Sequence, residues 1–215
     1  MSQKIGKYLL IEGIGAAGKS TQSKAVGDHL RGLGYQVVNI REPGSSKICE
    51  RIREILIHKD YKGTMSAKTS LFLFCAARHQ LINEVVKPLL AQGVNVITDR
   101  SYPSTIAIQG YAEGLDLGFV RTACAAAMDG LTFNKAFILD ISVNEGIARI
   151  ARRGLAQADR YDIMDKSFIE RIREGYLAQA HDPNFELIDG SREQNIITEE
   201  LVSKILPILV QNNPS

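Results

Sequence analysis

The segment Gly13–Ser20, Gly-Ile-Gly-Ala-Ala-Gly-Lys-Ser, limits the possible folds more than any other part of this 215-residue chain. It matches the pattern of a phosphate-binding loop, whose glycines bring backbone N–H groups against a triphosphate. The apolar run Tyr8–Glu12 before it is typical of a buried strand, and Thr21–Arg31 after it suits a helix. This order places the positive end of a helix against phosphate. The chain is therefore predicted to bind a nucleoside triphosphate, with Lys19 on the β- and γ-phosphates and the Ser20 hydroxyl on Mg²⁺.

Charge and cysteine content exclude several other classes. The net charge of +2 gives no general electrostatic reason for binding nucleic acid or an anionic membrane. Cys49, Cys75 and Cys124 are too far apart in sequence for a zinc motif or a disulfide framework, which favours a reducing compartment. The N-terminus has no signal-peptide hydrophobic region, and no apolar run approaches the length of a membrane span. We expect a soluble, cytoplasmic protein.

Apolar bursts alternate with helical stretches along the whole chain, which predicts a parallel sheet covered by helices on both faces. No linker, internal repeat or low-complexity segment interrupts the pattern, so residues 1–215 are expected to form one domain of the α/β class. The expected architecture is a three-layer P-loop NTPase fold with a five-stranded parallel sheet. The expected strands are Tyr8–Glu12, Gln36–Ile40, Val94–Thr98, Lys135–Ile141 and Phe185–Ile188. The expected helices are Thr21–Arg31, Ile48–His58, Lys68–Ala91, Asn144–Arg153, Lys166–His181 and Thr198–Gln211.

Charged residues follow three of the expected strands: Glu12, the pair Arg41-Glu42 and the pair Asp99-Arg100. Parallel sheets of this kind bind ligands at the carboxyl ends of their strands. Asp99 is placed to act on the Mg²⁺ shell or on the attacking oxygen, and Arg41 and Arg100 suit a second phosphate opposite the triphosphate. Each arginine taken alone fits a surface ion pair equally well. The three clusters together favour a functional site.

A basic stretch at about residues 150–162 is the expected mobile lid. Arg149, Arg152, Arg153 and Arg160 lie in or beside it, and Gly154 interrupts the cluster. A mobile arginine that closes over the transferred phosphoryl group would lower the barrier to transfer. A solvated helix end, with its cations near the negative end of the helix dipole, explains the same residues equally well. Spacing alone leaves both interpretations open.

Two aromatic residues, Phe72 and Phe74, lie two positions apart on an expected helix and so point in different directions. From the residues alone, packing in the core is the favoured role for both. Pro43 between Glu42 and Gly44 fixes a tight turn, but the sequence does not give the isomer of its peptide bond.

With these segments in order, the chain resembles bacterial thymidylate kinases over essentially its whole length. The phosphate loop is the most specific of the matching segments, and the order and spacing of the others add specificity. They are Ile11–Gly13 with Gly18–Gln22, Arg41–Gly44, Leu71–Arg78, Asp99-Arg100 with Ser104, Gln109-Gly110, Gly114–Asp116, Ile138–Asp140 and Asp159–Asp162.

The resemblance implies transfer of the γ-phosphate of Mg·ATP to the 5′-phosphate of dTMP, giving dTDP and ADP. It implies a homodimer joined through helices away from the cleft, and a catalytic arginine on the lid. It also places Phe74 in a stack on thymine, in place of the core role. The implied ATP-binding residues are Gly13, Ile14, Gly15, Ala16, Ala17, Gly18, Lys19, Ser20 and Thr21, and the metal residues are Ser20 and Asp99. The implied acceptor residues are Glu12, Arg41, Pro43, Phe74, Arg78, Arg100, Ser104, Thr105, Ile108 and Gln109. The implied catalytic residues are Lys19, Asp99, Arg100, Arg152, Arg153 and Arg160.

Three positions depart from the family pattern, and all lie around the acceptor. Gly15 replaces an acidic residue associated with the sugar hydroxyl, Ser101 replaces an aromatic or histidine, and Ile108 replaces an aromatic that crowds C2′ of the sugar. We therefore expect intact chemistry with relaxed or shifted sugar selectivity. The alternatives are a kinase of another pyrimidine nucleotide or nucleoside on the same scaffold, and a non-catalytic nucleotide-binding relative.

Overall fold

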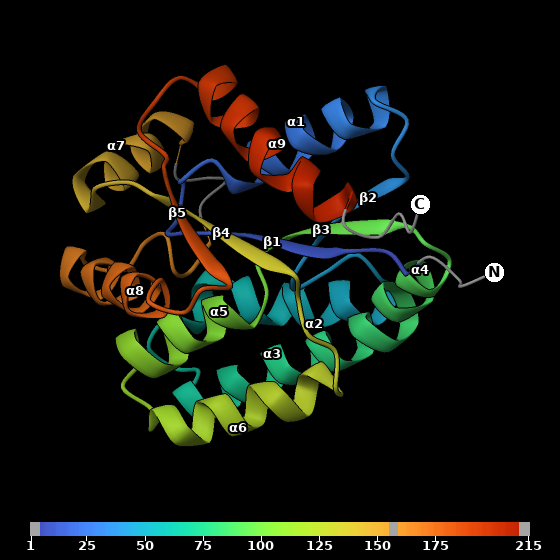
Figure 1. Ribbon diagram of the computed structural model, residues 1–215. Coiled ribbons are helices and arrows are strands. Elements are labelled where there is room, and N and C mark those ends of the chain that lie inside the picture. The colour runs from blue at the N-terminus through green and yellow to red at the C-terminus, as the bar shows by residue number, and fades with distance from the viewer. Residues whose placement is uncertain (1–4, 155–158, 211–215) are drawn as a thin grey trace.

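The computed structural model describes residues 5–154 and 159–210. Within them, five parallel strands form one sheet in the order β2-β3-β1-β4-β5, with helices above and below it (Figure 1). The α/β fold with a five-stranded parallel sheet is therefore confirmed. The strands are β1 Tyr8–Glu12, β2 Val37–Arg41, β3 Asn95–Asp99, β4 Lys135–Asp140 and β5 Phe185–Asp189.

Helices α1 and α9 pack together on one face of the sheet, and α2, α3, α5, α6 and α8 cover the other face (Figure 1). The described helices are α1 Lys19–Gly32, α2 Lys47–Ile57, α3 Ala67–Leu81, α4 Lys87–Ala91, α5 Tyr102–Thr105, α6 Leu117–Met128, α7 Val143–Arg153, α8 Lys166–Gln179 and α9 Gln194–Val210. A 3₁₀ turn, η1 Lys59–Tyr61, and two π-helical segments, η2 Ile82–Val86 and η3 Ile106–Ala112, complete them. None of the described helices is both long and apolar enough to cross a membrane.

Burial follows the position of each strand in the sheet. Every residue of the central strand β1 is buried, whereas the edge strands β2 and β5 have half-buried and exposed positions. The register pairs Arg41 and Ile11 with Asp99, and Glu12 with Ile138. Glu12, Arg41 and Asp99 therefore lie side by side at the carboxyl edge of the sheet, as the strand-end pattern predicts.

The long helix expected over Lys68–Ala91 is continuous through α3, η2 and α4, and it contains a π-helical turn. The wider turn ends at Val86, two residues before Pro88, which has no N–H for the regular i to i−4 bond. Ser66 begins this helix by accepting a hydrogen bond from the Thr69 N–H at 3.2 Å. The proline therefore does not end the helix, which continues through a π-helical turn as far as Ala91.

Two helical segments, α5 with η3 and then α6, lie where no element was expected. The N-cap of α6 is Asp116, which accepts from the Phe119 N–H at 2.8 Å, and Val120, Cys124 and Ala127 are buried on one side. That cap and spacing were available in the sequence. By contrast, the helix from Tyr102 to Ala112 is mostly buried. It has no exposed polar face, so its sequence does not alternate between polar and apolar residues with the helical period.

The lid expected at residues 150–162 falls partly outside the described residues, which omit 155–158. Before this gap α7 ends at Arg153, and after it Asp159–Asp165 leads into α8. Asp165 caps α8 by accepting from the Phe168 N–H at 2.9 Å. The segment is therefore connected to α7 on one side and to α8 on the other.

Candidate active site

The phosphate loop joins β1 to α1 with backbone conformations that favour glycine. Gly13 and Gly18 have φ of 140° and 98°. A Cβ on Gly13 would lie 2.5 Å from the Leu139 carbonyl oxygen, so the loop also packs closely against β4. The open N–H groups at the start of α1 and the positive end of its dipole make this loop suitable for anionic phosphate.

Three side chains with expected roles in phosphate and metal binding meet beside the loop. The ammonium group of Lys19 donates to the Ile14 carbonyl at 2.6 Å, and the Ser20 hydroxyl donates to Oδ2 of Asp99. Among the described residues, nothing hydrogen-bonds Oδ1 of Asp99, although this atom is buried. Burial lowers the pKa of Lys19 to about 7 despite the nearby carboxylates. A triphosphate would favour the charged form of this amine.

Glu12 is completely buried at the end of β1 and hydrogen-bonds three residues from other parts of the chain. Its carboxylate accepts from the Ser101 N–H at 2.6 Å, the Ser104 hydroxyl at 2.7 Å and the Tyr176 hydroxyl at 3.1 Å. Burial raises the pKa of Glu12 to about 7, against the opposing effect of the hydrogen bonds from Ser104 and Ser101 and the nearby positive charges of Arg100 and Lys19. These contacts join β1, the turn after β3 and α8 at one point. Glu12 was expected to bind the acceptor, and the contacts described give it a role in positioning.

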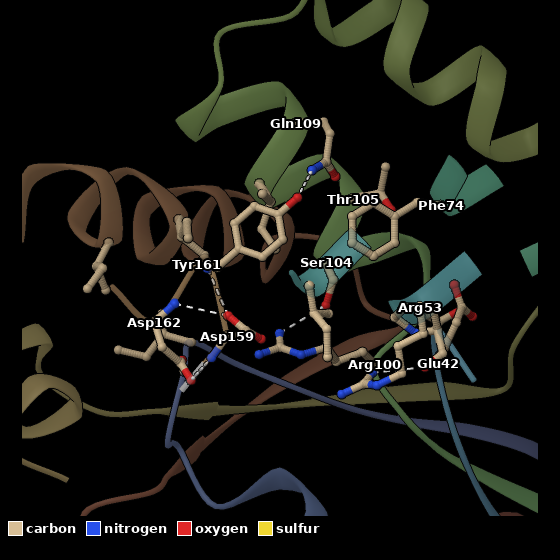
Figure 2. A pocket seen from close by; sticks show the side chains of 18 of the residues that line it. Glu42, Arg53, Phe74, Arg100, Ser104, Thr105, Gln109, Asp159, Tyr161 and Asp162 are labelled. Atoms are coloured by element: carbon tan, nitrogen blue, oxygen red, sulfur yellow. Dashed lines mark hydrogen bonds between the residues drawn. The ribbon is translucent and has the colours of Figure 1, made fainter. Parts of the chain in front are cut away.

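A largely apolar cavity opens beside the loop and contains the expected base-binding residues (Figure 2). The rings of Phe74 and Tyr161 are 6.3 Å apart and inclined at 38°. Gln109 donates to the Tyr161 hydroxyl at 3.1 Å, and its own carbonyl oxygen has no hydrogen-bond partner among the described residues. Ile108 lines the same cavity. Phe72, by contrast, is 56% exposed, so the two phenylalanines do point apart. Core packing was therefore wrong for Phe72, whereas Phe74 is buried and lines the cavity.

Arg78 forms an ion pair deep in the acceptor cavity. Its Nε lies 2.5 Å from Oε1 of Glu42, and both side chains are almost fully buried. A second nitrogen of the guanidinium donates to the Thr105 hydroxyl at 2.8 Å. The peptide bond between Glu42 and Pro43 is cis. Arg78, Glu42, Pro43 and Thr105 all line the cavity, so this pair carries a fixed donor group to the base end of the site.

Arg100 lies where the acceptor cavity joins the phosphate cavity and lines both. Its φ of 71° is unusual for a residue with a side chain, and its guanidinium donates to the Gly13 carbonyl at 3.1 Å and the Tyr176 hydroxyl at 3.1 Å. Arg53, donating to the Pro43 carbonyl at 2.9 Å, also lines both cavities. The junction is therefore bordered by two guanidinium groups.

Arg41, expected on the acceptor phosphate, lies on the wall of the phosphate cavity alone. One of its terminal nitrogens contacts both carboxylate oxygens of Glu50, at 2.8 and 2.9 Å, and its side chain is half-exposed. This is the surface ion pair that was the alternative interpretation of Arg41. Binding to phosphate would require this guanidinium to leave Glu50 or to share it.

The arginines near the lid differ in their surroundings. Arg153 lines the phosphate cavity and pairs with Oδ2 of Asp162 at 2.6 Å, and Arg149 lines the same cavity from α7. Arg152 is largely exposed and pairs with Glu145 at 3.0 Å. Arg160 is buried and donates to the Leu56 carbonyl at 2.6 Å and the Ser70 hydroxyl at 2.9 Å. Of the three lid arginines predicted to be catalytic, Arg152, Arg153 and Arg160, Arg153 is therefore the one that lines the phosphate cavity.

Several residues of the site were missed by sequence reasoning. Arg53 and Tyr176 project from α2 and α8, where they look like ordinary helix residues. Asp159, Tyr161 and Asp162 were noted as a matching segment, but no role was assigned to them. The signal available in the sequence was three polar or aromatic residues within four positions at the end of the basic stretch.

A parallel sheet with a phosphate-binding loop at its carboxyl edge and a second cavity opposite defines a P-loop nucleotide-binding protein. The family described as thymidylate kinase matches residues 11–201. A thymidylate kinase of Halothermothrix orenii is 35% identical over 209 residues, which are 96% of this chain and 99% of that protein. One of Caldanaerobacter subterraneus subsp. tengcongensis is 37% identical, covering 93% and 95% of the two chains. One of Chlorobium luteolum is 40% identical over 79% and 81%. The chain belongs to the thymidylate kinase family.

Proposed function

We propose that this protein transfers the γ-phosphoryl group of Mg·ATP to the 5′-phosphate of dTMP, giving dTDP and ADP. The observation that carries the proposal is that the two cavities are adjacent and share Arg100 in their linings. Triphosphate on the loop and a nucleoside monophosphate in the apolar cavity would bring their phosphates together at this guanidinium. The family membership and the thymidylate kinase names of the relatives support the same reaction.

The residues present fit a magnesium ion bound together with the triphosphate. Ser20 supplies a hydroxyl, and Asp99 supplies a carboxylate with one buried oxygen that lacks a hydrogen-bond partner. Mg²⁺ prefers such oxygen ligands and takes the remainder from phosphate and water. When bound, it would neutralise charge on the phosphate oxygens. Lys19 would add a second positive charge on the same oxygens, and Arg153 would approach them from the lid side.

The base end of the acceptor cavity favours thymine or uracil over cytosine. Arg78 is a fixed donor, which suits a base carbonyl, and the unpartnered carbonyl oxygen of Gln109 suits a ring N–H. Thymine and uracil carry an N–H at ring position 3, whereas cytosine carries an acceptor there. Phe74 offers a ring face on which a base can stack. Packing against one methyl group separates substrates by about 1–3 kcal/mol, so dUMP is expected to be a poorer acceptor than dTMP.

Relaxed sugar selectivity is the second candidate, and Ile108 favours it. This side chain lines the acceptor cavity and fills less space than an aromatic ring would. The test is release of ADP from Mg·ATP with dTMP, dUMP, UMP and dCMP as acceptors. A strong preference for dTMP supports the main proposal, and similar rates with UMP support the relaxed enzyme. ATP binding without ADP release from any acceptor would contradict both and favour a non-catalytic relative.

We also propose that the protein is a homodimer joined through the face formed by α2, α3 and α6. These helices pack together on the side away from the phosphate loop (Figure 1). Their exposed apolar residues include Ile48 and Ile55 on α2, Phe72 on α3 and Phe119 on α6. Phe72 and Phe119 pack edge to face at 6.2 Å, so these two exposed rings form one apolar patch. Light scattering should give twice the chain mass, and F72D should give a monomer. A monomeric wild type would contradict the proposal.

A further inference from the structure

Asp162 and Gly15 face each other at the junction of the two cavities, and both residues line both cavities. The phosphate loop with Lys19 lies on one side, and Phe74 and Gln109 lie on the other. A nucleoside monophosphate has its sugar between its phosphate and its base. With its phosphate toward the loop and its base between Phe74 and Gln109, its sugar would lie at the junction that Gly15 and Asp162 line. Figure 2 shows Asp162, Phe74 and Gln109 around the cavity.

The carboxylate of Asp162 occupies the space that a side chain at position 15 would need. A Cβ built on Gly15 would lie 2.5 Å from Oδ1 of Asp162, which is too close for any real contact. Gly15 has no positive φ to require glycine. The two residues are therefore matched: glycine at one position leaves room for the carboxylate that enters from the other.

Neighbouring groups fix the orientation of this carboxylate. Oδ2 of Asp162 accepts from Arg153 at 2.6 Å and from the Asp159 N–H at 3.3 Å. The Asp162 N–H donates to Oδ1 of Asp159 at 3.0 Å, which closes the turn on both sides. Among the described residues no hydrogen bond is made to Oδ1 of Asp162, the oxygen that faces Gly15. One oxygen is thus anchored and the other is left for a donor in the cavity.

We propose that Oδ1 of Asp162 accepts a hydrogen bond from the sugar hydroxyl of the acceptor nucleotide, and that Gly15 is glycine to admit it. The inference rests on the proposed function, and it names a specificity-determining residue of the same site. dTMP has one free sugar hydroxyl, on C3′, because its 5′-oxygen carries the phosphate. An ionised carboxylate is an acceptor that a hydroxyl can satisfy, and its loss costs more than that of a neutral partner.

The first test compares dTMP with 3′-deoxythymidine 5′-monophosphate in the wild type and in D162A and D162N. Loss of the carboxylate should lower kcat/KM for dTMP by about 10- to 100-fold and leave that for the 3′-deoxy analogue within about threefold. The wild-type preference for dTMP should therefore disappear. An equal fall with both acceptors would assign Asp162 only a structural part in the turn and would overturn the inference.

A reciprocal exchange tests the match between the two positions. G15D alone should lose activity with dTMP because two carboxylates compete for one space, whereas G15D in the D162A background should recover part of the preference for the 3′-hydroxyl. G15A should be impaired in the wild type and tolerated in D162A. Its methyl group would come too close to Oδ1 of Asp162, whereas Ile150 Cδ1, at 3.5 Å, is at an ordinary contact distance. Additive effects of the two substitutions would contradict the match.

Measuring nucleotide binding and ADP formation separately distinguishes the role of Asp162 from the proposed kinase activity. Calorimetric titration of the wild type and D162A with each monophosphate measures binding without phosphoryl transfer. Loss of the 3′-hydroxyl preference in binding supports Asp162 whether or not transfer occurs, and an unchanged preference overturns its role. Binding of dTMP without any ADP formation would overturn the proposed function alone. No binding of either monophosphate would overturn both.

Discussion

The two halves of the site are built in different ways. The phosphate cavity is formed around nine consecutive residues, Gly13–Thr21, whose backbone N–H groups and helix terminus would supply most of the phosphate recognition. The acceptor cavity takes single side chains from separate elements, including Phe74 from α3, Gln109 from η3 and Tyr161 from the segment before α8. A backbone site tolerates many side-chain changes but depends on a few residues absolutely. A site of assembled side chains can lose one member and keep the others.

The strongest way to break this contrast is Lys19→Ala. Lys19 is the one side chain of the loop placed to neutralise the β- and γ-phosphates, so its loss should lower kcat by on the order of 10³-fold. The fold should be unchanged, because the buried amine makes one contact to a loop carbonyl. Single-turnover rates with saturating ATP and dTMP measure the effect, and circular dichroism checks the fold. A fall of less than tenfold would show that the loop backbone alone supports transfer.

The acceptor side is tested next with Arg78→Met. This change leaves the Glu42 carboxylate buried without its partner and should lower the free energy of unfolding by about 3–5 kcal/mol. The half-exposed pair of Arg41 and Glu50 is the matched control, since E50Q should cost less than about 1 kcal/mol. Urea unfolding at pH 7 compares the two. Equal costs would show that burial does not distinguish these ion pairs.

The third prediction concerns how the free energy of unfolding depends on pH through Glu12, which lies between the two halves of the site. Its pKa is raised from 4.5 to about 7 in the folded protein, so the folded state holds this proton more tightly. The wild type should therefore lose stability relative to E12Q as pH rises from about 4.5 to about 7, by up to about 3 kcal/mol. The glutamine can still accept from the Ser101 N–H. Urea titrations at pH 5, 6 and 7 measure the difference, which a constant offset across this range would contradict.

The smallest expected effect sharpens the contrast within one helix. F74L should raise KM for dTMP by about 3- to 10-fold with little change in kcat, because a leucine provides no ring face for stacking. F72L, two residues away on the exposed side of α3, is the control and should leave KM unchanged. Initial rates over a range of dTMP concentrations are sufficient. A similar KM for both variants and the wild type would remove Phe74 from base recognition.

Much of the fold could be predicted from the sequence because it depends on local patterns. The five strands are apolar bursts separated by helical periods, and the loop Gly13–Ser20 fixes where the sheet binds phosphate. The π-helical turn before Pro88 and the buried helix Tyr102–Ala112 were not predictable in the same way. In the first, one proline alters hydrogen bonding without ending the helix. In the second, burial on all sides removes the alternation of polar and apolar residues on which the prediction depends.

The acceptor site illustrates the limit more clearly. Residue type and strand position were enough to place Asp99 and Arg100 at the carboxyl edge of the sheet, where both line the phosphate cavity. They were not enough for Arg53 or Asp162, because their roles depend on contacts across the fold. For Arg41, the spacing was compatible with a phosphate ligand and with a surface ion pair, and the contact with Glu50 was not visible in the sequence. Local sequence therefore predicts the donor half of the site better than the acceptor half.

The Glu12 network has a consequence for how this enzyme could change during evolution or be redesigned. Glu12 immediately precedes the loop, yet its carboxylate binds Ser101, Ser104 and Tyr176, which support the opposite half of the site. Phe74 and Ile108, which line the acceptor cavity and are proposed to select the acceptor, lie outside this network. Substitutions at the cavity wall could therefore alter acceptor preference without disturbing the Glu12 hydrogen bonds, which join the two halves of the site. The division makes the wall the natural target for engineering new nucleotide analogues as acceptors.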